Sequence, residues 1–247
     1  MIKIHKVCIS KQQFQALPRD ERALVFMAGH ILNQISVFMK LVRFSTSKDP
    51  VDPIEARCSA AQSQLILRCL VGVLAEAWEF LRRSQNQKII GRYLNDIGND
   101  GKTSYAKLKK HFGRSGLLHK LRNNYLYHYP NLQELEKAFE WIPEDEEWEW
   151  YLSDANTNSF YFSCELVLGY GIMSATSEPT HIGAFGLVMK EVMDVTNTLP
   201  YFLMPLVRAI LYKHLGKNIL DTKLAMTINN APKLDEFWIP FFAETSP

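Results

Sequence analysis

Two long segments with helical periodicity, joined by a short stretch that contains prolines, constrain this chain more than any other feature. In residues 18–44 apolar side chains recur at spacings of three and four, and residues 54–83 carry a second apolar stripe of the same kind. The connecting residues include Pro50 and Pro53, which break a helix. Helices of this length joined by a short turn pack side by side in opposite directions. The sequence therefore predicts a mainly α fold, built as an antiparallel helical bundle.

The middle of the chain gives weaker signals. Shorter helices are expected at residues 87–97, 103–129 and 131–141, and the sequence GNDG at 98–101 predicts a turn. Residues 145–170 crowd aromatic side chains around the polar sequence DANTNS. That arrangement is typical of a small β-hairpin.

The C-terminal part returns to helical spacing over residues 181–215, where Pro200 and Pro205 are expected to kink or break the helix. We therefore divide the chain into two parts. A helical bundle occupies residues 1–140. An extension at residues 141–247 carries the aromatic hairpin and further helices, and it is expected to pack on the same core.

Composition and charge exclude several classes of protein. Of 247 residues, 47% are hydrophobic and 22% are charged, which is enough to bury a core and excludes a disordered chain. No apolar run of the secretory type opens the sequence, and Arg68, Glu76 and Glu79 interrupt the longest apolar stretch, Leu65 to Leu81. We therefore expect no membrane span and a cytoplasmic location, with the four cysteines reduced.

Charge is distributed in a step that the net charge of +2 conceals. From Gly101 to Gln133 there is no acidic residue, whereas Glu134 to Trp150 is strongly acidic. A basic helix with interleaved tyrosines can hold an RNA backbone and stack bases, although the two segments could instead neutralise one another inside the fold. The residues expected to contact RNA are Lys109, Lys110, Arg114 and Lys120.

The centre of the basic segment reads HKLRNNYLYHYP, residues 119–130. Arg122 is followed by the polar Asn123, and His128 comes six residues after Arg122. This pattern, behind two long helices, resembles the signature of HEPN-domain ribonucleases. The resemblance covers roughly residues 18–140 and implies a HEPN-like bundle. It also implies RNA cleavage without a metal, a site built across a homodimer, and a toxin–antitoxin or phage-defence context.

The residue types suit that chemistry. Internal cleavage of RNA uses the ribose 2′-hydroxyl as nucleophile, so a proton must move and the phosphorane must be stabilised. Histidine can transfer that proton at neutral pH, and arginine presents a planar fork to phosphate oxygens. We therefore expect Arg122 and His128 to be catalytic, with Asn123 supporting them. No metal or cofactor is expected, and the expected partners are RNA, a second copy of the chain, and an antitoxin or other protein.

Geometry leaves alternatives open. On an ideal helix Arg122 and His128 project about 120° apart and lie about 9 Å apart along the axis, so they need not face one phosphate. A homodimer could join Arg122 of one subunit with His128 of the other. Alternatively, His128 is a structural histidine at a helix C-terminus, Arg122 pairs with the acidic segment, and Asn123 is a surface residue. A non-catalytic helical dimer module that binds RNA or a protein is the second hypothesis.

Overall fold

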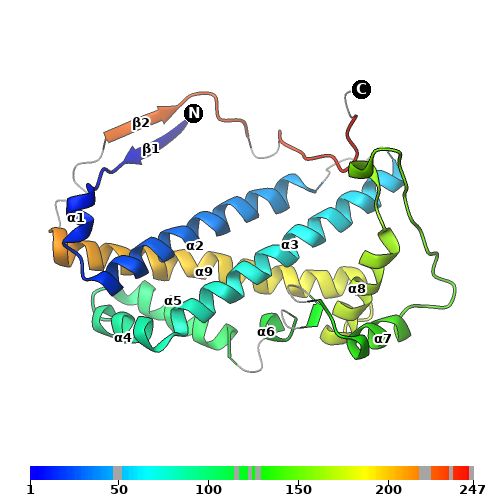
Figure 1. Ribbon diagram of the computed structural model, residues 1–247, viewed down its shortest axis with the longest axis horizontal. Helices are drawn as coiled ribbons and strands as arrows, with labels where there is room; N and C mark the ends of the chain where they lie inside the picture. Colours follow the sequence, from blue (N-terminus) through cyan, green and yellow to red (C-terminus); the bar gives the residue numbers. More distant parts are fainter. Residues whose placement is uncertain are drawn as a thin grey trace.

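The computed structural model describes residues 1–46, 52–113, 117–121, 124–125, 129–216, 224–233 and 236–244. Over these residues the protein is mainly helical, and its long helices run along the longest dimension of the molecule (Figure 1). They are α2 (Arg19–Phe44), α3 (Pro53–Arg82) and α9 (His181–Leu215). The predicted mainly α fold is therefore confirmed, whereas its likeness to the HEPN bundle stays a prediction.

Helices α2 and α3 form the antiparallel pair that the sequence predicted (Figure 1). Asp52 begins α3, because its carboxylate accepts hydrogen bonds from the backbone N–H groups of Ile54 and Glu55 at 2.7 and 3.2 Å. These are donors that the first turn of a helix otherwise leaves unpaired. The apolar stripe of α2 points into the core through Leu24, Ala28, Ile31 and Ile35.

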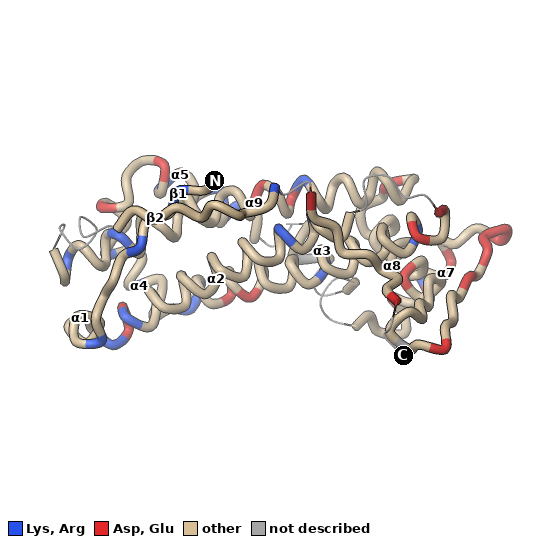
Figure 2. Tube along the Cα trace, turned by 90° about the horizontal axis from the view of Figure 1, so that it is seen from above, with Lys and Arg blue, Asp and Glu red and all other residues tan. Residues whose placement is uncertain are grey.

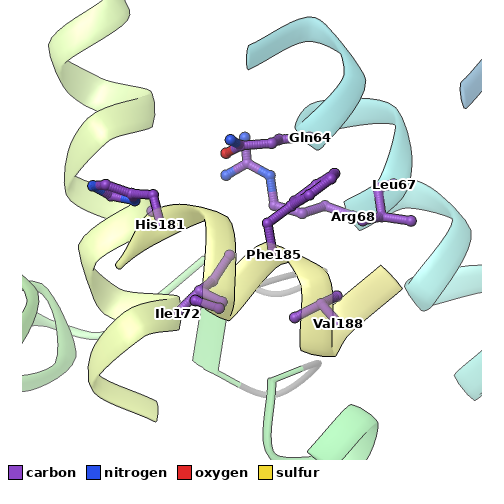
Figure 3. Close-up of a pocket in the computed structure, with 9 residues that line it drawn as sticks. Gln64, Leu67, Arg68, Ile172, His181, Phe185 and Val188 are labelled. Atoms are coloured by element: carbon purple, nitrogen blue, oxygen red, sulfur yellow. The ribbon is translucent and has the colours of Figure 1, made fainter. Parts of the chain in front are cut away.

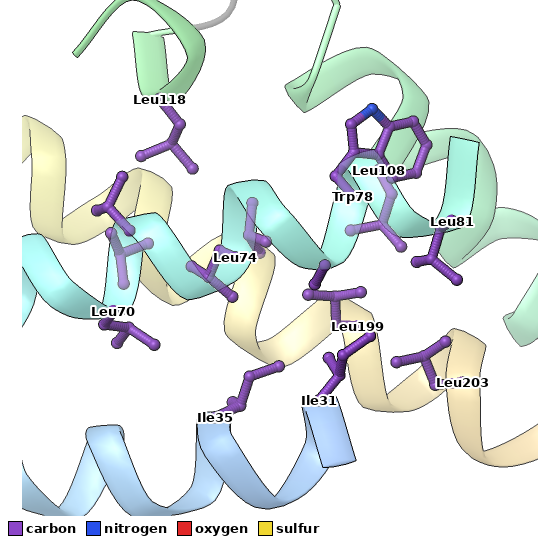
Figure 4. Packing of buried hydrophobic residues seen from close by; sticks show 14 of the residues in the cluster. Ile31, Ile35, Leu70, Leu74, Trp78, Leu81, Leu108, Leu118, Leu199 and Leu203 are labelled. Carbon is purple, nitrogen blue, oxygen red and sulfur yellow. The ribbon is translucent and has the colours of Figure 1, made fainter. Parts of the chain in front are cut away.

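Helix α9 packs against α2, α3, α5 and α8 and so joins the two halves of the chain. Its apolar face is completely buried at Leu199, Phe202 and Leu203. Figure 4 shows Leu199 and Leu203 beside Ile31 of α2 and Leu81 of α3. Pro200 and Pro205 lie within the helix, which continues through both. One hydrophobic core therefore extends from Leu17 to Leu211.

Shorter helices surround these three. A turn was predicted at residues 98–101, but the turn lies at residues 94–97, and α5 begins at Gly98, which has a positive φ of 72°. The predicted helix at 103–129 is divided between α5 and α6. The short helices are α1 (Lys11–Gln15), α4 (Ser84–Tyr93), α5 (Gly98–His111), α6 (Leu117–Leu121), α7 (Leu132–Glu140) and α8 (Phe162–Thr176).

The predicted hairpin at residues 145–170 is wrong. Its strand-like content is a single antiparallel bridge between Tyr151 and Phe160, around the 3-10 turn η2 (Asn156–Asn158). The chain then enters α8 at Phe162. Apolar residues occupy most positions from Phe162 to Gly171, so periodicity cannot distinguish a strand from a helix there.

The N-terminal strand β1 (Ile2–Lys6) pairs with β2 (Leu224–Ile228) in a two-stranded antiparallel sheet, in which Ile4 pairs with Met226 (Figure 1). The segment after β2 returns to the junction of α2 and α3. There the backbone N–H of Ile239 donates to the carbonyl oxygen of Phe44 at 2.8 Å. The side-chain amide of Gln62 donates to the carbonyl oxygen of Ile239 at 3.0 Å.

Helices α2 and α3 are long and apolar enough to cross a membrane by length and composition, contrary to the expectation from the sequence. Of the apolar window in each, 28% is buried in α2 and 61% in α3. Core helices of soluble proteins pass the same test, so these helices are weak evidence for a membrane location.

Candidate functional site

The sequence-predicted catalytic residues Arg122, Asn123 and His128 lie outside the described residues, as does Arg114. Lys120 belongs to α6, and its side chain is likewise outside the description. Lys109 and Lys110 are described, and both are exposed in the last turn of α5. The ammonium group of Lys109 lies over the ring of Tyr105, 4.4 Å from its centroid. The structure therefore shows the framework around the motif and part of its basic flank.

The described residues next to the motif are anchored in the core. Leu118 and Leu121 of α6 are completely buried, and the side chain of Tyr125 is 6% exposed. The hydroxyl of Tyr125 donates to the carbonyl oxygen of Glu134 at 3.3 Å. Burial raises the pKa of this tyrosine, and the charge of Glu134 raises it further, so the hydroxyl keeps its proton. Leu118 and Leu121, before Arg122, and Tyr125, between Arg122 and His128, therefore anchor this part of the chain in the core.

The sequence Gly-Tyr-Gly at 169–171 of α8 contacts this framework on two sides. A Cβ atom at Gly171 would lie only 2.4 Å from a ring carbon of Tyr125, and one at Gly169 would lie 3.0 Å from the ring of His181. Between them, the ring of Tyr170 packs edge-on against His181, with ring centroids 4.4 Å apart. The absence of side chains at both glycines is therefore what allows Tyr125 and His181 to approach α8. The sequence alone gave no reason to select these glycines.

Behind this layer lies a small pocket with a volume of about 20 Å³, whose walls are mainly apolar apart from Gln64, Arg68 and His181. Arg68 of α3, which interrupts the longest apolar stretch of the sequence, is buried and forms an ion pair with Glu165 of α8. Figure 3 shows the polar ends of Arg68 and Gln64 next to one another, across the pocket from His181. Such a volume has room for about one water molecule and none for a nucleotide.

Burial determines the charge states in this pocket. Removal from water lowers the pKa of His181, so its ring is neutral at neutral pH, and its Nε2 atom has no hydrogen-bond partner among the described residues. Burial also lowers the pKa of Arg68 to about 10, which leaves the guanidinium charged beside Glu165. The charged pair therefore ties α3 to α8, while the neutral ring of His181 packs α9 against Tyr170 of α8.

A second buried network joins α2, α4 and α9. Glu21 is 2% exposed, and its carboxylate accepts hydrogen bonds from the hydroxyl of Tyr93 at 2.5 Å and from Nε2 of His214 at 2.7 Å. Arg92 forms an ion pair with the same carboxylate at 3.0 Å. Burial alone raises the pKa of Glu21, but these hydrogen bonds and the charge of Arg92 outweigh it and lower the pKa overall.

The charge step of the sequence is also present in space. Acidic residues gather at the end of the molecule that holds α7 and the segment after it (Figure 2). Within the described part of the chain, no ion pair joins the lysines of α5 to this acidic segment, where Glu149 pairs with Arg57 and Glu146 accepts a hydrogen bond from Tyr170 at 2.8 Å. The described lysines are thus not neutralised by the acidic segment.

Across the described ranges, no group of three His, Cys, Asp or Glu side chains is arranged to hold a metal ion. Comparison with known proteins found no matching family model, no matching curated protein and no matching solved structure.

Proposed function

We propose that this protein is a metal-independent endoribonuclease of the HEPN type, with Arg122 and His128 as its catalytic pair and Asn123 supporting them. One observation carries the proposal: the sequence Arg-Asn followed by His at the sixth position lies in a segment of 33 residues, 101–133, that has no acidic residue. Such a segment favours phosphate binding, because carboxylates beside the site would repel the RNA backbone. A cytoplasmic location and a role in toxin–antitoxin or phage-defence systems belong to the same proposal.

Two features of the described residues support it. Lys109 and Lys110 are exposed, and they form no ion pair with the acidic segment within the described ranges, so they are free to contact RNA together with Arg114 and Lys120. The buried side chains of Leu121 and Tyr125 give the motif a rigid support. Catalytic groups need such support because small displacements reduce the rate strongly.

The proposed reaction follows from the residue types. Histidine removes the proton of the 2′-hydroxyl or returns one to the leaving 5′-oxygen, while the guanidinium stabilises the charge that develops on the phosphorane oxygens. The products are a 2′,3′-cyclic phosphate and a 5′-hydroxyl. The proposed site includes a second copy of the chain, whose His128 acts with Arg122 of the first.

The test is incubation of the purified protein with a mixed-sequence RNA in the presence of EDTA. Cleavage that leaves 2′,3′-cyclic phosphate ends is expected, and RNA methylated at the 2′-oxygen is expected to resist. His128→Ala should abolish cleavage but retain most binding, whereas Arg122→Ala should reduce both. His5→Ala and Arg19→Ala, at exposed positions of the described chain, serve as matched controls. Cleavage that requires a divalent ion, or that persists in both motif variants, would contradict the proposal.

The acidic end favours a second candidate, a non-catalytic module that binds a protein. Phe139 and Trp148 form a ring pair with centroids 5.7 Å apart, and both are more than half exposed. Exposed aromatic side chains surrounded by charge are typical of protein interfaces, here with an antitoxin or other protein partner. Neither cleavage nor binding of RNA under any of the conditions above would favour this candidate, whereas binding of RNA with no cleavage would favour a non-catalytic module that binds RNA.

A further inference from the structure

A groove with a volume of about 770 Å³ runs between α2 and the C-terminal half of α9. It is separate from the small pocket beside His181 and is lined by a different part of α9. Its walls are mainly apolar, and two of the large side chains that line it, Tyr201 and Met204, are more than half exposed. A volume of this size, with apolar walls and few polar groups, is within the usual range for small-molecule sites.

Three residues that weaken helices lie together in this groove. They are Gly29 of α2 and the two prolines of α9, Pro200 and Pro205. Glycine and proline each destabilise a helix interior relative to alanine, and proline does so more strongly. Packing within the chain does not require Gly29 to be glycine, because a Cβ atom there would meet nothing within 4 Å. The missing side chain deepens the groove.

The two ends of the groove differ in charge. A proline has no N–H to donate, so the carbonyl oxygens four residues before each proline, at Thr196 and Tyr201, lose their usual helical partner. Thr196 lies at one end of the groove and Tyr201 about midway along it, whereas Arg208 lies toward the other end and forms no ion pair among the residues that the structure describes. From Thr196 to Arg208 the helix rises about 18 Å, which is the length scale of a single long acyl chain.

We propose that this groove binds a free fatty acid. The acyl chain lies along the apolar walls over Gly29 and Met204, and the carboxylate pairs with Arg208. The opposite orientation is disfavoured, because it would bring the carboxylate to the Thr196 end, where a carbonyl oxygen without its helical N–H partner repels an anion. Charge therefore selects an anion at one end of the groove, and shape selects an unbranched apolar chain along it. The site is independent of the proposed ribonuclease function.

The experiment is calorimetric titration of the full chain with dodecanoate below its micelle concentration, beside dodecan-1-ol and dodecylammonium. Saturable binding of one dodecanoate is expected, with the ammonium compound at least about tenfold weaker because Arg208 repels it. Gly29→Leu fills the groove and favours the helix, so it should fold and weaken dodecanoate binding about tenfold or more. Gly91→Leu is the matched control, since a Cβ atom there also meets nothing within 4 Å but lies outside the groove.

Arg208→Gln should weaken dodecanoate about tenfold and leave dodecan-1-ol unchanged, because only the charge is removed. If Gly29→Leu does not fold, Met204→Glu provides a second test: its exposed position tolerates the change, and the new carboxylate repels the ligand. The proposal is overturned if Gly29→Leu or Met204→Glu binds dodecanoate as the unchanged protein does, or if Arg208→Gln weakens both ligands equally. It is also overturned if the protein binds anionic phospholipid vesicles but not monomeric dodecanoate.

Discussion

Gly171 of α8 is the point at which the bundle contacts Tyr125, a described residue within the motif. The ring of Tyr125 occupies the space that a side chain at Gly171 would need, since a Cβ atom there would lie 2.4 Å from a ring carbon. We expect Gly171→Ala to lower the free energy of unfolding by about 1–3 kcal/mol, because the added methyl group overpacks this contact. Urea denaturation measures the change. Gly186→Ala, at a helical glycine with nothing within 4 Å, should instead be neutral or stabilising. Equal effects of the two changes would contradict the Tyr125 contact.

Glu21 makes stability depend on pH at the acidic end of the range. Because its pKa is lowered in the folded protein, its contribution is present above the pKa of the unfolded chain and is lost as pH falls through the folded pKa. Glu21→Gln should lower the free energy of unfolding by about 1–3 kcal/mol at neutral pH, since it leaves Arg92 and His214 without their carboxylate. It should also flatten the loss of stability below about pH 5.

Urea denaturation from neutral to acidic pH measures both effects of Glu21→Gln. Glu136→Gln is the control, at an exposed position of α7, and it should change the free energy of unfolding by less than about 0.5 kcal/mol. If the free energy of unfolding depends on pH in the same way for Glu21→Gln and for the unchanged protein, the network does not lower the pKa of Glu21.

At the scale of elements, α9 determines whether the two halves of the chain form one core. Leu199 is completely buried and lies between α2 and α3 in Figure 4. Leu199→Ala should lower the free energy of unfolding by about 2–5 kcal/mol, through lost burial and a cavity. Met204→Ala, five residues later on the exposed side of α9, should cost less than about 0.5 kcal/mol. A second, separate unfolding transition in Leu199→Ala would indicate that the halves unfold independently.

Elements with a one-sided apolar stripe were predictable, and others were not. The stripe fixed α2 and α3 to within one residue at each end, because periodicity reports which face is buried. It failed at α8, where most positions are apolar, and the turn predicted at residues 98–101 lies instead at residues 94–97, before α5. The buried charged networks could not be predicted from the sequence, because their partners are far apart along the chain. Glu21 and His214 are separated by 193 positions, and Arg68 and Glu165 by 97. Of the candidate site, the structure describes the basic flank and the buried anchors, while the catalytic residues remain predictions.

At the scale of the whole molecule, the proposed site depends on two copies of the chain. An isologous dimer contains two equivalent sites, each with Arg122 from one subunit and His128 from the other. Arg122→Ala and His128→Ala should therefore each be inactive alone. If the two are mixed, unfolded and refolded together, half of the dimers carry both kinds of subunit. Each such dimer has one intact site and one site with both changes, so about one quarter of the unchanged activity should return.

Cleavage of RNA by the refolded mixture, compared with each variant refolded alone, measures this recovery, and sedimentation confirms that the mixture is dimeric. The recovery is specific to a shared site, because a site within one subunit would carry one of the two changes in every chain. A mixture as inactive as its components would contradict the composite site. It would leave the ribonuclease proposal standing if the unchanged protein cleaves RNA in EDTA, since that result depends on the residue types and not on which subunit supplies them.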